Sequence, residues 1–130
     1  ILIDAPCSGE GTLRGTPKTA VMWNPNTIKK LSKKQKHLLE AALEILKPKG
    51  EIVYSTCTHA PEENEEVVSH ILNNFENIKI ESIKLPVMCR PGLLQWNGKI
   101  YSNEVEKSCR IYPQDNNTEG FFIAKLRRIK

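Results

Sequence analysis

Two cysteines follow two β-rich runs of the chain at the points where those runs end. Cys7 lies just beyond the apolar run of residues 1–5, and Cys57 lies just beyond the run of residues 52–55. In open α/β sheets ligands bind beyond the carboxyl ends of the strands, so two thiols placed there share one crevice if both strands belong to one sheet. Because a cysteine thiolate is a nucleophile, the spacing predicts covalent catalysis on a substrate held between two sulfurs.

Polar groups surround the first of these cysteines. Asp4 precedes Cys7 by three residues, and its carboxylate could accept hydrogen bonds from an amine or a ring nitrogen. The backbone N–H groups of residues 8–11 could line an anion- or base-binding concavity. Cys89 and Cys109 lack such a setting, so we interpret them as structural residues. The sequence leaves open whether these two form a disulfide.

The bulk composition bounds the class of protein. The chain has 130 residues, which suits one domain, and its 39% hydrophobic content can support one core. The net charge of +4 is compatible with an anionic partner. No apolar run approaches the ~20 residues of a membrane span, and no Cys-x-x-Cys spacing or Cys/His cluster indicates a metal. Four cysteines in a charged chain favour a reducing compartment, so we expect a cytoplasmic monomer that binds no membrane and no metal.

The pattern of the first half predicts a strand, a long loop and a helix. Residues 1–5 are typical of a parallel strand covered on both faces. We expect residues 6–26, which are rich in Gly, Pro, Thr and Ser, to form a functional loop. Apolar residues at helical spacing predict a helix over 27–46, and five lysines crowd its first half, Lys29 and Lys33 among them. These lysines are either a solvated face or a phosphate-contacting patch.

The second half continues the alternation of strands and helices. We expect a strand over 52–55 and a helix over 61–75, whose acidic first turns suit the positive end of the helix dipole. We interpret those glutamates as helix-start residues. A strand over 78–83, irregular chain over 85–112 and a last strand over 121–126 follow. This order predicts an α/β half-sheet that begins with parallel units and ends in a β-hairpin.

Several motifs of the chain form a specific combination. They are Asp4-Ala5-Pro6-Cys7-Ser8-Gly9, Tyr54-Ser55-Thr56-Cys57-Thr58, Pro61-Glu62-Glu63-Asn64-Glu65, and Arg110-Ile111-Tyr112-Pro113 with Thr118-Glu119-Gly120-Phe121-Phe122-Ile123-Ala124. In this order they resemble the motifs of the Nol/Nop/Sun (RsmB-like) family of RNA cytosine-C5 methyltransferases. The resemblance spans nearly the whole chain, and the archaeal tRNA members are the most similar in general texture.

The resemblance implies an S-adenosylmethionine-dependent enzyme on a Rossmann-like class I methyltransferase sheet. Cys57 would be the nucleophile that attacks C6 of a cytosine flipped out of RNA, which allows C5 to take the methyl group. Cys7 would assist the elimination that releases the product from Cys57. Asp4 would orient the cytosine and, with Pro6, contact the cofactor.

The resemblance also implies an RNA partner, with tRNA preferred over rRNA. Two positions that concern local substrate contacts depart from the family pattern. Gln114 stands where the family has His after its Arg-x-x-Pro tetrad, and Gly15 stands where a basic pair usually follows Gly-Thr-Leu. The residues that we expect to contact RNA are Ser8, Arg14, Lys29, Lys33 and Arg110.

The family's glycine-rich cofactor loop, and the acidic residues that hold ribose and adenine, have no counterpart in this sequence. By resemblance, residues 1–130 are the C-terminal part of one methyltransferase catalytic domain. We expect the cofactor-binding N-terminal half to lie on the same polypeptide. Without that half, we expect this chain to be inactive and to hold the cofactor poorly.

Two other function classes stay open from the residues. One is a non-catalytic RNA-binding fragment that uses the lysine-rich helix and the basic tail of residues 125–128. The other is a cysteine hydrolase or acyltransferase that pairs Cys57 with His59. The short spacing between these two residues at a strand end argues against a direct thiol–imidazole pair, and we interpret His59 as a surface turn residue.

Overall fold

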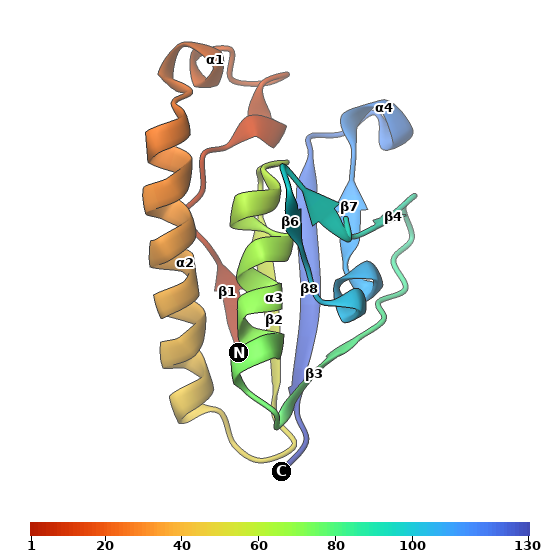
Figure 1. Cartoon of the computed structure of the whole chain (residues 1–130). Coiled ribbons are helices and arrows are strands. Elements are labelled where there is room, and N and C mark those ends of the chain that lie inside the picture. Colours follow the sequence, from red (N-terminus) through yellow and green to blue (C-terminus); the bar gives the residue numbers. More distant parts are fainter.

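The computed structural model describes residues 1–130 and contains one mixed sheet as its main feature (Figure 1). Strand β1 (Leu2–Asp4) pairs in parallel with β2 (Glu51–Thr56). The long strand β8 (Phe121–Arg128) pairs antiparallel with the other edge of β2. The predicted parallel pair that opens the sheet is therefore confirmed.

The far edge of β8 carries the rest of the sheet. Both β3 (Ile78–Glu81) and β7 (Cys109–Ile111) pair antiparallel with β8, and β4 (Arg90–Pro91) pairs with β7. The two strands predicted to close the sheet, 78–83 and 121–126, do pair antiparallel as β3 and β8, whereas β7 comes from the stretch predicted to be irregular. Because β8 is antiparallel to both β2 and β3, those two strands run in the same direction but are separated by it.

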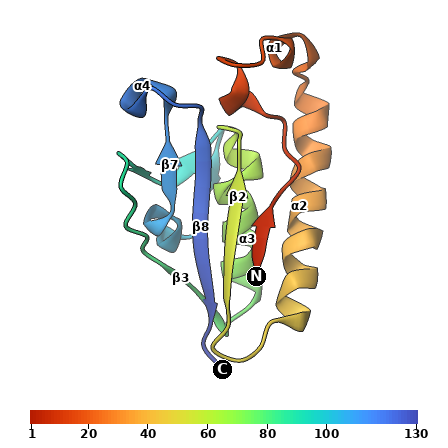
Figure 2. The same cartoon turned by 180° about the vertical axis from the view of Figure 1, so that it is seen from behind.

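Two helices pack on one side of the sheet. Helix α2 (Pro25–Ile45) connects β1 to β2, and α3 (Glu65–Asn74) packs against it and crosses the sheet face (Figure 1). Seen from behind, no helix crosses β2 or β8 (Figure 2). At the start of α2, the Asn24 side chain accepts from the N–H of Asn26 at 2.8 Å, and Pro25 occupies the first helical position. The helix predicted over 27–46 is thus confirmed with an earlier start.

Three stretches differ from the expectation. The loop predicted over 6–26 contains two short helical segments, and the region predicted as irregular over 85–112 contains short strands. The helix predicted over 61–75 is interrupted at Asn64, whose φ of −115° and ψ of −95° lie outside the helical range. The remaining elements are η1 (Glu10–Thr12), α1 (Lys18–Met22), η2 (Pro61–Glu63), β5 (Gln95–Trp96), β6 (Lys99–Ile100), η3 (Asn103–Lys107) and α4 (Pro113–Asn116).

Alternate residues of β2 and β8 build the core beneath α3. The rings of Tyr54 and Phe122, both 0% exposed, meet edge to face with centroids 6.3 Å apart. The edge strand β1 is covered on one face only, because Ile3 is buried while Leu2 is 71% exposed. The prediction that this strand is buried on both faces is wrong for these residues. None of the helices combines the length and apolar character that crossing a bilayer requires.

Candidate active site

The two thiols singled out by the sequence lie side by side. β1 and β2 end at the same edge of the sheet, with Asp4 opposite Ser55. The Cys7 and Cys57 sulfurs are 3.0 Å apart, and the Cys57 N–H donates to the Cys7 sulfur at 3.4 Å. Both side chains are half-buried. The fold therefore places two thiols within direct hydrogen-bonding distance of each other.

The environment of Cys7 favours its protonated form. Burial raises the pKa of the Cys7 thiol to about 12, and the hydrogen bond with Cys57 acts in the same direction. Cys7 therefore keeps its proton at neutral pH. A protonated Cys7 can donate to the sulfur of Cys57, which gives the pair one proton donor beside one acceptor.

Asp4 and Pro6 flank this pair on the exposed side. The Asp4 side chain receives one long hydrogen bond, from Ser55 Oγ at 3.4 Å, and is otherwise open to solvent. Pro6 is exposed as well, although its carbonyl oxygen accepts from Gln35 Nε2 at 2.7 Å. The Asp4 carboxylate thus has acceptor capacity left for a ligand beside the thiols.

A buried carboxylate fixes the loop that follows Cys7. Glu63 is 0% exposed and accepts from the backbone N–H and the hydroxyl of Ser8, at 2.9 and 2.5 Å, and from Gln35 Nε2 at 3.0 Å. Burial raises the pKa of Glu63, and the hydrogen bonds from Ser8 and Gln35 oppose that rise. The Ser8 hydroxyl also meets Thr58 Oγ1 at 2.8 Å. Ser8 is therefore hydrogen-bonded within the protein, and the RNA contact predicted for it stays a prediction.

The next residue fixes the loop around Cys57. Asn64 is 0% exposed, and its side chain accepts from Thr56 Oγ1 at 2.6 Å and donates to the Thr58 carbonyl at 2.9 Å. Both contacts lie directly beside Cys57 in the chain. The backbone break at Asn64 between η2 and α3 turns this amide toward the strand end. Asn64 is thus a positioning residue for the second thiol.

Glu65 completes the series by holding the C-terminal motif. Its carboxylate accepts from Arg110 Nε at 2.7 Å and from Arg110 Nη2 at 2.6 Å, and both side chains are buried. Arg110 also donates to the His59 carbonyl at 3.0 Å. Burial alone would lower the pKa of Arg110, but the Glu65 carboxylate outweighs it and raises that pKa. Arg110 is only 2% exposed, so its guanidinium is engaged mainly within the protein, and the RNA contact predicted for it stays a prediction.

Three consecutive polar residues therefore hold three separate pieces of the site. Sequence analysis included these residues in a family motif but assigned them no role in the site, because it interpreted the glutamates only as helix-start residues. Asn64 is also the residue before α3, where asparagine commonly caps a helix, but its side chain makes no cap hydrogen bond and contacts Thr56 and Thr58 instead. The pairing of a buried Glu65 with the Arg110 of a distant motif has no local signature.

Two glycines allow the loops to meet. The Gly11 N–H donates to the Cys57 carbonyl at 2.8 Å, and the Gly120 N–H donates to the Gly11 carbonyl at 2.8 Å. A Cβ on Gly11 would lie 2.3 Å from the Gly120 oxygen, and a Cβ on Gly120 would lie 2.1 Å from the His59 ring. The first loop, the Cys57 loop and the C-terminal motif consequently pack at van der Waals distance only because both positions lack a side chain.

Nearly the whole chain matches one known protein family. A model of the family described as 16S rRNA methyltransferase RsmB/F matches residues 1–127. The chain belongs to the RsmB/F methyltransferase family. The match covers every motif on which the resemblance was based, and the mixed sheet with its helices agrees with the methyltransferase structures below.

Members of the RsmB/F family are longer than this chain. The tRNA (cytosine(49)-C(5))-methyltransferase of Pyrococcus abyssi is 47% identical over 128 residues, which are 98% of this chain and 41% of that protein. The ribosomal RNA small subunit methyltransferase F of Vibrio atlanticus is 38% identical over 130 residues, which are 99% of this chain and 26% of that protein. The chain thus spans less than half the length of these curated relatives.

Solved structures agree with the fold. A methyltransferase homolog protein from Pyrococcus horikoshii has a TM-score of 0.83 at 41% identity, covering 98% of this chain and 38% of that one. The structure of NSun6 from Pyrococcus horikoshii has a TM-score of 0.81 at 34% identity, covering 100% of this chain and 30% of that one. The Rossmann-like methyltransferase sheet predicted from the motifs is therefore confirmed.

The other residues that we singled out lie around this centre. Arg14 is exposed and donates to the Asn117 side chain, and Lys29 and Lys33 are exposed on α2. His59 is half-buried and stacks on Tyr112 at 5.2 Å between centroids, so it is not a surface turn residue. Burial and the nearby Arg110 lower the pKa of His59.

The second pair of cysteines stays apart from the site. Cys89 and Cys109 are both free thiols, Cys89 half-buried and Cys109 buried. Gln114 is exposed on α4.

Proposed function

We propose that the protein containing this chain is an RNA cytosine-C5 methyltransferase. The observation that carries the proposal is the contact between Cys7 and Cys57, with sulfurs 3.0 Å apart at the carboxyl ends of two parallel strands. Family membership and the names of the relatives support the same reaction class. We propose tRNA as the substrate before rRNA, because the tRNA enzyme of Pyrococcus abyssi is 47% identical and the Vibrio rRNA enzyme 38%.

Each thiol has its own role in the proposed reaction. The Cys57 thiolate attacks C6 of a cytosine flipped out of the RNA, and the base becomes nucleophilic at C5. After the methyl group has reached C5, loss of the C5 proton expels the Cys57 sulfur from C6. Cys7 is protonated and 3.0 Å from that sulfur, so it can protonate the leaving thiolate and assist release. Asp4 orients the cytosine by accepting from its amino group.

The cofactor that we propose is S-adenosylmethionine, which supplies a methyl group activated by its sulfonium centre. Asp4 and Pro6 are the residues of this chain that would hold it. The fit rests on the Asp4 carboxylate, whose single long hydrogen bond from Ser55 leaves acceptors for an ammonium group.

We propose that the rest of the cofactor site lies on the same polypeptide, in a part that covers the open edge of the sheet. β1 is an edge strand, and Ile1 and Leu2 are 48% and 71% exposed. Apolar side chains on an unpaired strand edge favour a covering element. The greater length of the relatives supports the same view. Residues 1–130 would then be the C-terminal part of one catalytic domain and inactive alone.

Four free cysteines suit a reducing compartment. We therefore propose that the enzyme works in the cytoplasm. We also propose that it acts as a monomer.

The proposal is tested with the intact polypeptide and RNA that contains 5-fluorocytosine. Fluorine at C5 blocks the elimination, so the wild-type protein should form an adduct that survives denaturing electrophoresis. Cys57→Ala should abolish the adduct. Cys89→Ala serves as the matched control, because it removes a half-buried thiol outside the site, and it should leave the adduct unchanged. An adduct of normal yield in Cys57→Ala would show that the nucleophile is misassigned.

A further inference from the structure

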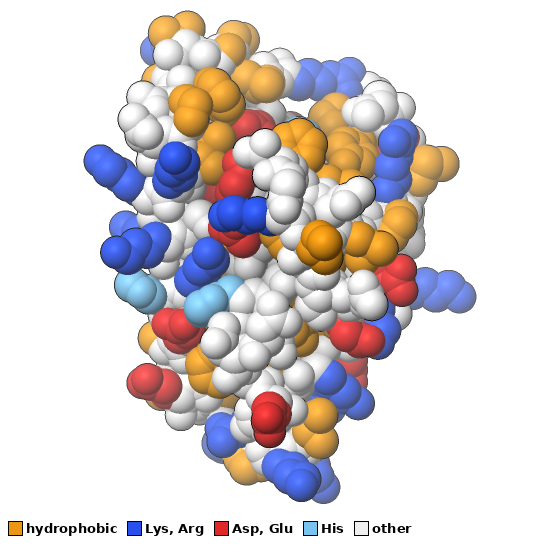
Figure 3. Space-filling view, in the orientation of Figure 1, with side chains coloured by type: hydrophobic (Ala, Val, Ile, Leu, Met, Phe, Trp, Pro, Cys, Tyr) orange, Lys and Arg blue, Asp and Glu red, His pale blue; other side chains and the backbone are white.

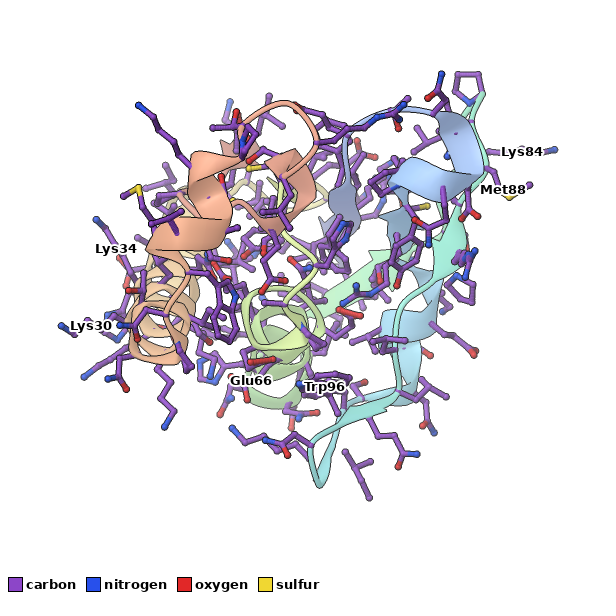
Figure 4. The ribbon with its side chains drawn as sticks, turned by 90° about the horizontal axis from the view of Figure 1, so that it is seen from above. Lys30, Lys34, Glu66, Lys84, Met88 and Trp96 are labelled. Atoms are coloured by element: carbon purple, nitrogen blue, oxygen red, sulfur yellow. The ribbon has the colours of Figure 1, made fainter.

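A groove separates the lysine-rich helix from the β5–β6 hairpin. It has a volume of about 720 Å³ and is bordered by α2, the start of α3 and the hairpin (Figure 4). A second cavity of about 330 Å³ adjoins it and reaches His59, two residues beyond Cys57. Trp23, Ile28 and Trp96 line both cavities. The two cavities thus share a wall, and the smaller one extends the groove to His59 in the loop that follows Cys57.

The two tryptophans of the chain stand at the junction of these cavities. Trp23 is 49% exposed and Trp96 is 48% exposed. The Trp23 indole donates to Glu10 at 2.7 Å, which fixes its orientation and leaves the ring available. Aromatic rings held half-exposed in a charged groove are typical platforms on which unpaired bases stack.

The walls of the groove carry a net positive charge. Four lysines line it against two glutamates, and basic side chains gather over this face of the molecule (Figure 3). Lys36 and Lys99 reach Glu66 from opposite walls, at 3.1 and 2.6 Å. Burial would raise the pKa of Glu66, but these two ammonium groups outweigh it and lower that pKa. Lys29 and Lys33 make no ion pair, so their charges remain available to phosphates.

We propose that this groove binds an unpaired RNA segment next to the target cytosine. Its phosphates lie along Lys29 and Lys33, and a base stacks on Trp96 and Trp23. The location fits, because α2 begins at the same end of the molecule as the carboxyl ends of β1 and β2 (Figure 1). The inference rests on the proposed function and adds to it the surface that holds the flanking RNA.

The first test compares two pairs of lysines on one helix in the intact polypeptide. Lys29→Ala/Lys33→Ala removes two groove charges, whereas Lys30→Ala/Lys34→Ala removes two charges that point away from the groove (Figure 4). For a single-stranded RNA oligonucleotide, losing two phosphate contacts should lower the slope of log K against log salt by about 1.4. The affinity should fall about tenfold in the groove variant only. Equal losses of affinity in both variants would mean that the helix acts as a general basic surface, and the proposal that RNA lies in the groove would be wrong.

The second test isolates stacking. Trp96→Ala should weaken binding of the oligonucleotide about tenfold, whereas Trp96→Phe, which keeps an aromatic face, should retain most of it. Wild-type tryptophan fluorescence should be quenched by RNA. If RNA binding is unchanged in Trp96→Ala, no base stacks on Trp96 and the proposal fails. The 5-fluorocytosine adduct is scored on the same variants at saturating RNA. If the groove variants form a normal adduct and bind RNA as the wild type does, only the proposal for the groove is rejected. If the wild type itself forms no adduct, the proposed methyltransferase function is rejected.

Discussion

The Cys7 sulfur lies 3.0 Å from the Cys57 sulfur, although 50 residues separate them in the chain. The contact follows from the parallel register of β1 and β2, which brings both strand ends to one edge. Two buried side chains then hold the loops in place. Glu63 accepts from Ser8 in the loop after Cys7, and Asn64 donates to Thr58 in the loop after Cys57. Two thiols in contact therefore depend on two adjacent buried side chains from a third segment.

Removing Cys7 should trap the reaction after methyl transfer. Cys7→Ala leaves Cys57 free to attack C6 but removes the thiol that protonates the departing sulfur. We expect a covalent enzyme–RNA complex to accumulate even when the RNA contains ordinary cytosine in place of 5-fluorocytosine. Cys57→Ala, in contrast, should give no complex. Denaturing electrophoresis of the intact polypeptide after incubation with RNA and cofactor measures this. Normal turnover in Cys7→Ala would assign release to another group.

Glu63 should make stability depend on pH in a defined direction. Its pKa is raised in the folded state by burial, so the folded protein holds this proton more tightly than the unfolded chain. The stability that this proton contributes is fully present below the unfolded pKa and is lost as pH rises through the folded pKa. Glu63→Gln removes the titration, so the Tm of the variant relative to wild type should rise between pH 4 and pH 7. A pH-independent difference would show that the Glu63 pKa is not raised.

The sequence could predict the meeting of the two thiols because it depends on a local rule. A strand, a helix and a second strand form a right-handed parallel unit, and the ends of such strands coincide. The insertion of β8 between β2 and β3 could not be predicted in this way. That order depends on which distant strand pairs best with the free edge of β2, and local periodicity does not record it.

Side-chain type was a weaker guide than position. Ser8 and Arg110 were predicted to contact RNA, and the structure shows in addition that both are bonded to buried carboxylates. Burial of a charged pair depends on two segments far apart in the chain. The position of Cys57 at a strand end carried more information than the charge of Arg110.

The buried ion pair between Glu65 and Arg110 should show strong coupling. Glu65→Gln or Arg110→Met leaves one buried charge without its partner, at a cost of about 3–5 kcal/mol in the free energy of unfolding. The double variant removes both charges, so its loss should be clearly smaller than the sum of the single losses. Arg110→Lys should also be destabilising, because lysine cannot make the bidentate contact. Urea unfolding of the wild type, the two single variants Glu65→Gln and Arg110→Met, and the double variant gives the coupling energy. Additive losses of stability would contradict the ion pair.

A methyl group at Gly11 should separate the three loops of the site. It would lie 2.3 Å from the Gly120 oxygen and 2.7 Å from the Cys57 oxygen, and both are backbone atoms that cannot rotate away. Gly11→Ala should therefore cost about 1–3 kcal/mol in stability and reduce the 5-fluorocytosine adduct. Gly15→Ala is the matched control in the same loop, because its nearest neighbour is the flexible Glu119 side chain. It should change stability by no more than about 0.5 kcal/mol. Similar effects of the two substitutions, in urea unfolding and adduct yield, would mean that Gly11 does not set the approach of these loops.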